Sequence, residues 1–295
     1  MMADSIDTSI TSSTPLLNDA EATVHKQNYE KDIIYLYQFC RTTLLPSLSP
    51  YCLKVETWLR LAGLNYENVD DKMKLRSKKG QLPIVQLNGE DIAHTDIIKK
   101  LGQRFEKDLD AGLSNDQKNV SYTTISMIEN HLWWVLIWWR TKYPDTVIKG
   151  YRMNMQNALG TRIPNGILSF CYKFSFAPKG AKKVKAQGMG MHKPEEIIEF
   201  GQNDIKVLSD MLADKPFFFG DEPTTLDVVA FASLAQIYFI DKEVKFSLRD
   251  YMQESCPNLV GHVNRMKEMC FPDWEDICKT LDLNAHLPKP PPEEK

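Results

Sequence analysis

The chain has 295 residues, of which hydrophobic side chains make up 43%, so it is long enough for two domains with a sizeable core. A formal net charge of -3 and a pI near 6.1 exclude the basic footprint of a nucleic-acid-binding protein, and we expect no nucleic-acid partner. The six cysteines include no C-x-x-C pair, which excludes the usual zinc and disulfide-framework patterns. We expect no metal site and a reducing compartment such as the cytoplasm.

The N-terminal segment and the apolar runs argue against targeting or membrane insertion. Residues 1–30 are rich in Ser, Thr and Asp and poor in large apolar side chains, which predicts a disordered tail rather than a signal peptide. The most apolar run, residues 132–139, is far shorter than the ~20 residues that a spanning helix needs. We therefore expect no membrane span.

Ordered structure is predicted to begin with a strand, a helix and a second strand. Residues 33–39 are rich in β-branched and aromatic side chains, as strands are, and residues 64–69 are the second predicted strand. Between them, Ser49 occupies a helix N-cap and Pro50 the first helical position, where its missing N–H costs nothing. Gly63 marks the end of this helix.

The next stretch predicts a hairpin followed by a helix. Asn88-Gly89 is a strong hairpin signal, because a type I′ turn needs two successive residues with positive φ. Thr95 is placed to cap the following helix, whose apolar residues recur at helical spacing: Ile97, Ile98, Leu101 and Phe105. Residues 31–107 therefore have the element order of a thioredoxin-like domain, with a small sheet covered by helices.

Pro83 is the informative residue of the hairpin, because proline cannot donate a hydrogen bond to a sheet. Either it is a trans proline at an edge strand, or the Leu82-Pro83 bond is cis. A cis bond would turn the N–H and C=O groups of Leu82 outward, where they could pair with the backbone of an extended peptide ligand.

From residue 108 to residue 283 the pattern is wholly helical. Residues 119–142 form a long amphipathic stretch crowded with tryptophan, and residues 194–212 form another. Thr224 and Asp227 form a capping box before a helix that is apolar around most of its circumference, so this helix is expected to be buried.

Two further segments are predicted to lie outside this helical pattern. A basic insertion near residues 165–193 is expected to be a mobile loop. It is either simply solvated or attracted to an anionic membrane surface or an acidic partner. Residues 284–295 predict a proline-rich tail.

Three motifs, in their order along the chain, resemble those of the glutathione transferase fold: QLPIV, the Thr95-Asp96 pair, and PTTLD at the start of the buried helix. The resemblance covers residues 33–283. It implies an α/β thioredoxin-like N-terminal domain that binds glutathione and an all-α C-terminal domain that supplies a pocket for a small electrophile. A homodimer is also expected from this fold.

Two longer strings resemble, more narrowly, the failed axon connections branch of this superfamily, which is related to the metaxins: SLSPYCLKVETWLRLAGLNYE and NHLWWVLIWWR. This branch implies a role in axon development and a protein partner in neuronal signalling. It also implies a cytoplasmic or axonal location with peripheral association with membranes. The metaxins would imply a mitochondrial outer-membrane anchor, for which the sequence offers no spanning segment.

The resemblance also assigns the residue that activates the thiol. Ser49 occupies the place of the hydroxyl that stabilises the glutathione thiolate, and the alternative is that it is only a helix cap. Three other side chains are alternative thiol-activating groups: Tyr37, Tyr51 and Cys52. Cys52 falls on an apolar helix stripe, so a buried inert thiol is the competing interpretation, and for Tyr37 it is ordinary core packing.

Glutathione itself would be held, by the same resemblance, by Leu82, Pro83, His94, Thr95 and Asp96. Thr95 and Asp96 match the positions that hold its glutamyl end, and both also suit ordinary helix capping. His94 departs from the acidic or amide residue usual before this pair.

The electrophile pocket is assigned to three tryptophans of the long helix, with core packing as the competing interpretation: Trp133, Trp134 and Trp138.

Two functions follow from the resemblance. The first is weak or atypical conjugation of glutathione to small electrophiles, combined with a role in axon development. The second is a non-catalytic protein of the same fold that acts in binding or signalling.

Overall fold

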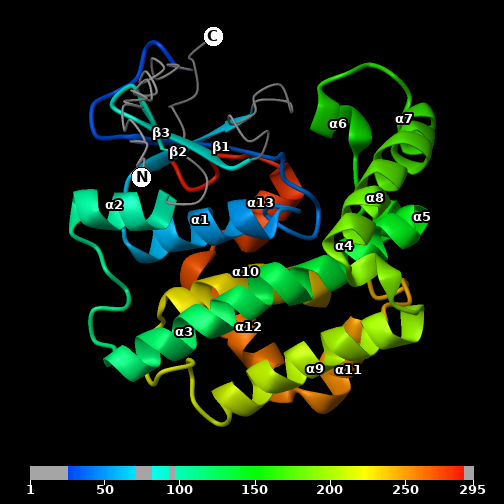
Figure 1. The fold of residues 1–295 in the computed structure, drawn as a ribbon. Coiled ribbons are helices and arrows are strands. Elements are labelled where there is room, and N and C mark those ends of the chain that lie inside the picture. Colours follow the sequence, from blue (N-terminus) through cyan, green and yellow to red (C-terminus); the bar gives the residue numbers. More distant parts are fainter. Residues whose placement is uncertain (1–25, 71–81, 93–96, 289–295) are drawn as a thin grey trace, which may run out of the picture.

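A four-stranded mixed sheet forms the N-terminal half of the computed structural model, which describes residues 26–70, 82–92 and 97–288 (Figure 1). The strands are β1 (Ile34–Gln38), β2 (Tyr66–Asp70), β3 (Ile84–Leu87) and β4 (Glu90–Ile92). Their order in the sheet is β2-β1-β3-β4, with β1 parallel to β2 and antiparallel to β3. This is the predicted thioredoxin-like arrangement, and the fold class is confirmed.

Local signals set the ends of the elements around the sheet. Helix α1 (Pro50–Leu61) begins after its N-cap Ser49 and ends before Gly63, whose φ of 65° lies in the left-handed region. Asn88 and Gly89 both have positive φ, as the predicted type I′ turn requires. Helix α2 (Ile97–Phe105) then packs Ile97 and Leu101 into the core.

The second half of the chain is helical. A single long helical rod contains α3 (Asn115–Met127), a π-helical turn η1 (Ile128–Leu132) and α4 (Trp133–Lys142). The later helices of this half are α9 (Pro194–Leu212), α10 (Thr225–Tyr238), α11 (Ser247–Ser255), α12 (Pro257–Cys270) and α13 (Trp274–Thr280). Helix α1 lies between the sheet and α10, so that one continuous apolar core joins the two halves (Figure 1).

Helix α10 is the centre of the helical half. Every residue from 226 to 237 is buried, as its apolar circumference predicts. The predicted capping box is present: the Asp227 carboxylate accepts the Thr224 N–H at 2.8 Å. The same carboxylate accepts the Phe218 N–H at 3.0 Å and lies 2.9 Å from Nε2 of His262.

The expectation of a loop near residues 165–193 is wrong, because most of the insertion is helical. Residues 165–193 contain α7 (Asn165–Cys171), the π-helical turn η2 (Tyr172–Phe176), α8 (Ala177–Gln187) and the short 3-10 turn η3 (Met189–Met191). Two short helices, α5 (Pro144–Gly150) and α6 (Met155–Leu159), precede them and together with them form the insertion between α4 and α9. Helix α8 packs along α4, with Val184 buried. Gly180 approaches α4 so closely that a Cβ there would lie 2.6 Å from the Thr141 methyl group. The buried stripe of α8, which includes Val184, is narrow, so the lysine-rich composition of this segment gave no helical signal.

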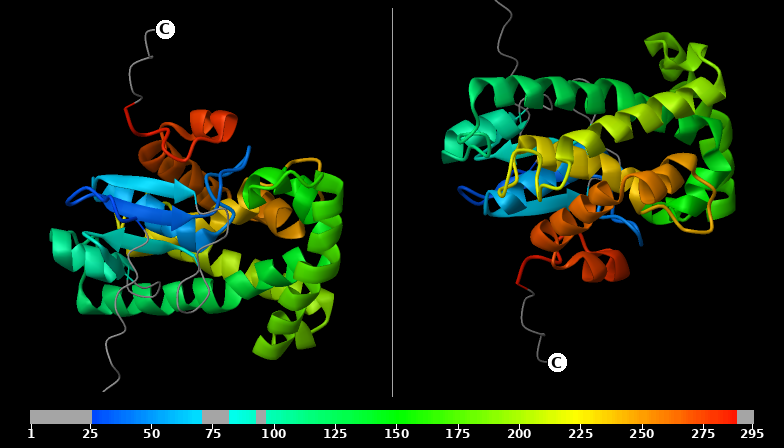
Figure 2. Two further views of the ribbon diagram at one scale, coloured as in Figure 1. Left: turned by 90° about the horizontal axis from the view of Figure 1, so that it is seen from above. Right: turned by 90° about the horizontal axis from the view of Figure 1, so that it is seen from below.

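The described ends of the chain both contact the sheet. Lys26 donates its N–H to the Gln86 side chain at 3.0 Å. At the other end, Asn284 bonds both backbone groups of Asn68 on the edge strand β2, at 2.7 and 3.0 Å. The C-terminal segment therefore lies beside the sheet (red in Figure 2).

None of the helices in the described ranges combines the length and the apolar character needed to cross a bilayer.

Candidate functional site

An apolar cavity of about 310 Å³ lies where the loop after β1 meets the helical half. The loop contributes Cys40 and Ser49 to its wall. Helix α4 contributes Trp133, Ile137 and Arg140, whose spacing of four and three residues places them on one helix face. The insertion closes the other side with α5, α6 and η2. The first two lie in the stretch that the sequence predicts to be helical, whereas η2 lies in the expected loop.

Ser49 is both a helix cap and a residue of the cavity wall. Its Oγ accepts the Cys52 N–H at 3.3 Å, and its own N–H donates to Oγ of Ser47 at 3.3 Å. The two interpretations made from sequence are therefore compatible, because capping α1 is what holds the hydroxyl at the cavity. Its catalytic role stays a prediction.

Cys52 is completely buried. Burial raises the pKa of its thiol to about 12, although hydrogen bonds from Ser49, the Phe39 backbone and Ser47 act in the opposite direction. A thiol with such a pKa is almost entirely protonated at neutral pH, and thiolate is the reactive form. The structure thus favours the interpretation of Cys52 as an inert core residue.

The two candidate tyrosines have different surroundings. Tyr37 is buried and its hydroxyl donates to the Gln86 side chain at 3.0 Å. Tyr51 contacts Trp133 edge to face, with ring centroids 5.8 Å apart. Burial, and then the charge of Glu129, raise the pKa of Tyr51 above its ordinary value, so its hydroxyl stays protonated.

The predicted glutathione-binding residues are only partly described. The Leu82-Pro83 bond is cis, which is the second alternative considered from the sequence. Leu82 packs in a small buried cluster that also contains Tyr37 and Cys52. His94, Thr95 and Asp96 lie outside the described residues.

Of the three predicted pocket tryptophans, Trp133 lines the cavity. Trp138 is buried and meets the ring of Tyr143 edge to face, while Trp134 is half-buried against the core. Neither of the latter lines the cavity, because helical periodicity turns positions 134 and 138 away from the face that carries Trp133 and Arg140. For these two tryptophans the structure supports the core-packing interpretation.

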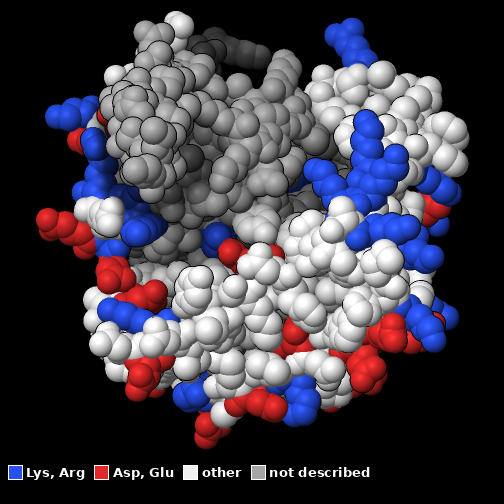
Figure 3. Space-filling view, in the orientation of Figure 1, with Lys and Arg blue, Asp and Glu red and all other residues white. Residues whose placement is uncertain are grey.

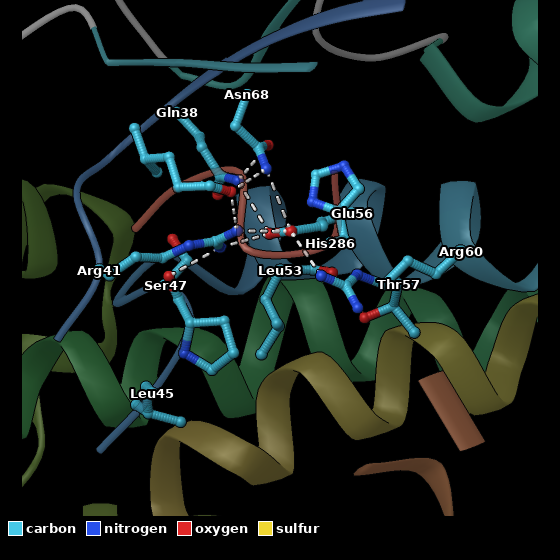
Figure 4. A network of polar contacts seen from close by, with 12 residues as sticks. Gln38, Arg41, Leu45, Ser47, Leu53, Glu56, Thr57, Arg60, Asn68 and His286 are labelled. Carbon is cyan, nitrogen blue, oxygen red and sulfur yellow. Dashed lines mark hydrogen bonds and ion pairs between the residues drawn. The ribbon is translucent and has the colours of Figure 1, made fainter. Parts of the chain in front are cut away.

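A buried ion pair fixes the loop that carries the cavity residues (Figure 4). Arg41 donates to both carboxylate oxygens of Glu56, at 2.6 and 2.7 Å, and both side chains are buried. Arg41 also donates to the carbonyl oxygens of Pro46 and Leu283. Burial by itself would raise the pKa of Glu56, but the charge and hydrogen bonds of Arg41 outweigh it and lower that pKa to about 2.

Three more polar groups complete the network around Glu56. Gln38 and Asn68 donate to its carboxylate at 2.8 and 3.3 Å, and the Tyr66 hydroxyl donates at 3.1 Å. The network therefore joins the ends of β1 and β2 to α1 and to the C-terminal segment. It positions the loop, although none of its members was singled out from the sequence.

Sequence reasoning missed Arg140 and Cys40 as cavity residues. Arg140 donates to the Leu48 carbonyl, the Tyr151 hydroxyl and the Gln236 side chain, each at 2.9 Å. Its spacing from Trp133 could have placed it on the cavity face. The contribution of Tyr151 had no comparable signal, because it depends on how the insertion folds back.

A second and larger cleft, of about 790 Å³, lies between α1, α2 and α3. Charged residues stand on its wall, among them Lys54 and Glu129, which form an ion pair at 2.6 Å. None of the described residues predicted for the site lines this second cleft.

In the described part of the chain, no group of three or more His, Cys, Asp or Glu side chains could hold a metal ion.

Comparisons with known proteins agree with this architecture. The profile described as "Glutathione S-transferase N-terminal domain" matches residues 50–146, and "Glutathione S-transferase, C-terminal domain" matches residues 201–266. A solved glutathione S-transferase from Methylobacterium radiotolerans, in complex with glutathione sulfonate, superposes with a TM-score of 0.52 at 14% identity, covering 83% of this chain and 93% of that one. This likeness shows the fold.

Sequence relatives place the chain more narrowly. Failed axon connections of Drosophila melanogaster is 66% identical over 276 residues, covering 92% of this chain and 66% of that longer protein. Isoprene-epoxide--glutathione S-transferase of Rhodococcus sp. (strain AD45) is 29% identical, covering 80% and 98%. The Metaxin-1 homolog of Drosophila is 24% identical, covering 77% and 69%. The chain therefore belongs to the glutathione S-transferase family, in the branch that contains Failed axon connections.

Proposed function

We propose that this protein binds glutathione and conjugates its thiolate, at a low rate, to small electrophiles. The observation that carries the proposal is the position of Ser49, which caps the N-terminus of α1 and also lines the apolar cavity beside Trp133. A thiolate placed there would meet a hydroxyl group and the positive end of the helix dipole, and both favour ionised sulfur.

In this proposal residues 31–107 bind the tripeptide and residues 108–283 supply the cavity. The thiol loses its proton to solvent, and its sulfur forms a thioether bond with the electrophilic carbon. The electrons of the bond that breaks leave with the displaced atom. The name of the Rhodococcus relative, an isoprene-epoxide transferase, supports this type of reaction, and that relative aligns over 98% of its length.

A non-catalytic role in axon development is the second candidate. It is supported by the 66% identity to Failed axon connections. In this alternative the cavity and the outer surface bind a ligand, a neuronal signalling partner or a second copy of the chain. A cytoplasmic and axonal location belongs to the same proposal.

Peripheral association with anionic membranes is also part of the proposal, and the insertion supports it. Phe170 and Phe174 are 62% and 60% exposed, one helical turn apart. Exposed lysines of α8 follow them: Lys179, Lys182, Lys183 and Lys185. Figure 3 shows lysine and arginine side chains gathered over the end of the molecule where α7 and α8 lie. Aromatic side chains flanked by lysines suit the interface of a bilayer with anionic headgroups.

A glutathione titration followed by a conjugation assay tests the catalytic proposal. The full chain is titrated with glutathione by calorimetry and then assayed with 1-chloro-2,4-dinitrobenzene. For Ser49→Ala we expect a loss of kcat/KM of about tenfold or more with glutathione affinity nearly unchanged, since the hydroxyl acts on the thiolate. Ser114→Ala, which removes the N-cap of α3 far from the cavity, is the matched control and keeps full activity.

Each outcome has a distinct meaning. Saturable glutathione binding without turnover supports the non-catalytic alternative, and the absence of binding eliminates the transferase proposal altogether. Turnover that survives Ser49→Ala transfers the activating role to Tyr51 or Tyr37.

A further inference from the structure

Arg140 brings a positive charge to the wall of the apolar cavity without an acidic partner among the described residues. Its three hydrogen-bond acceptors are neutral: the Leu48 carbonyl, the Tyr151 hydroxyl and the Gln236 side-chain oxygen. By contrast, Arg41 faces the carboxylate of Glu56. The charge of Arg140 is therefore solvated by dipoles but not neutralised.

The surroundings of Arg140 strengthen its electric field in the cavity. Tyr151 and Gln236 are fully buried, and the guanidinium stands over the rings of Trp133 and Tyr151, 5.3 and 4.8 Å from their centroids. Aromatic faces stabilise a cation but add no negative charge. In addition, Nε of Arg140 is buried and has no acceptor in the described structure. Arg140 itself is half-buried, and a cation in such partly screened surroundings attracts an anion more strongly than one in bulk water.

Most of the remaining wall of the cavity is apolar, although Ser49, Tyr151 and Tyr172 also line it. Ile137 of α4 lines it together with three apolar residues of the insertion: Val147, Met153 and Leu159. Apolar walls with a small number of polar groups are typical of ligand sites, in which the polar groups fix the orientation of the ligand. The volume of about 310 Å³ lies at the small end of the usual range, so a medium-length chain suits it.

We propose that the cavity selects an elongated apolar molecule that carries one carboxylate, with the carboxylate at Arg140 and the chain along the apolar wall. The proposal rests on the function proposed above, in that it names the chemical class held by the same cavity. Binding of such a molecule by itself requires neither bound glutathione nor catalysis. A medium-chain fatty acid, or an electrophile with such a carboxylate tail, has this chemistry.

Calorimetry on the full chain, without glutathione, tests the selection with three ligands of equal length: decanoate, 1-decanol and decylamine. We expect decanoate to bind about tenfold or more tightly than decanol, as a charge-assisted contact implies, and decylamine to bind least. Arg140→Met should reduce decanoate affinity to the level of decanol, and Arg140→Lys should restore most of the difference. The matched control is Arg162→Met, an exposed arginine outside the cavity, which should change nothing.

Because Arg140→Met also removes three structural hydrogen bonds, a second variant keeps the test independent of folding. Ala158→Trp fills the cavity from α6 and leaves Arg140 itself unchanged, and it should abolish binding of decanoate and decanol alike, with an unchanged circular-dichroism spectrum. Equal affinities of the wild-type chain for decanoate and decanol would overturn the proposal, as would binding of neither.

The result is separable from the test of the transferase activity. Decanoate binding in a chain that does not bind glutathione supports the cavity assignment and leaves the conjugation proposal refuted. Conjugation of neutral electrophiles, without any preference for carboxylates, would support the conjugation proposal and refute the assignment of a carboxylate ligand to the cavity.

Discussion

At the scale of single residues, the Arg41–Glu56 pair shows how this chain keeps two charges in its core. Each side chain uses several hydrogen bonds, and Glu56 accepts from Gln38, Asn68 and Tyr66 as well as from Arg41. The folded pKa of Glu56, about 2, lies below its ordinary value of 4.5. Ionised Glu56 therefore stabilises the fold above pH 4.5, and this contribution is lost as the pH falls from 4.5 towards 2.

Removing one partner of this pair should be costly. We expect Arg41→Met to lower the free energy of unfolding by about 3–5 kcal/mol, because Glu56 would remain buried without its counter-charge. Urea denaturation at neutral pH measures the change. Arg41→Met combined with Glu56→Leu should recover much of the loss, while Lys206→Met, which breaks an exposed pair with Asp210, should cost less than about 0.5 kcal/mol. A single variant as stable as the wild type would contradict this account.

At the scale of elements, α10 shows how one carboxylate anchors a buried helix. Asp227 caps the helix through Thr224, ties down the preceding segment through Phe218 and meets His262 of α12. Because all of these groups are buried, each needs its partner in the protein rather than in water. The short T-x-x-D motif thus serves tertiary structure as well as helix initiation.

The Asp227→Ala variant tests this anchoring. We expect the free energy of unfolding to fall by about 2 kcal/mol or more, since two buried N–H groups lose their acceptor. Ser114→Ala, at the exposed capping box of α3, should cost only about 1 kcal/mol. Urea denaturation of both variants gives the comparison, and equal losses would mean that Asp227 is no more than an ordinary cap.

At the scale of the whole molecule, the insertion between α4 and α9 has two faces. Inside, Tyr172 lines the cavity together with Phe176, which is itself 52% exposed. Outside, Phe170 and Phe174 stand in solvent beside the lysines of α8. An exposed apolar face of this kind suits the proposed membrane contact, and the neighbouring positive charges favour an anionic surface. The same segment therefore links the candidate site to the proposed membrane contact.

Vesicle cosedimentation tests the outer face. The full chain should sediment with phosphatidylcholine vesicles that contain phosphatidylserine and much less with phosphatidylcholine alone. The double variant Phe170→Ser and Phe174→Ser should lose most of this binding, because both apolar anchors are removed. Tyr122→Ser, which changes a tyrosine of α3 that is 75% exposed, is the control. Binding that is insensitive to the double variant, or absent from both vesicle types, would refute the membrane contact.

Local sequence signals were sufficient for most of the elements. The N-cap at Ser49, the positive φ at Asn88 and Gly89, and the capping box at Thr224 depend on neighbours a few residues apart, so they can be deduced without the fold. The helical period of residues 194–212 is likewise local and is observed with these bounds. Lysine-rich composition concealed α8, because its buried stripe is narrow.

The sequence by itself determined the order of the strands and of the helices outside residues 165–193, most of their caps and turns, and the place of Ser49 at the start of α1. Only the tertiary structure decided the cavity, its arginine and the buried charge network. The physical reason is separation along the chain: Arg41 donates to the carbonyl of Leu283, and Arg140 to the side chain of Gln236. Contacts between such distant segments depend on how whole elements pack, which no local periodicity or capping motif encodes.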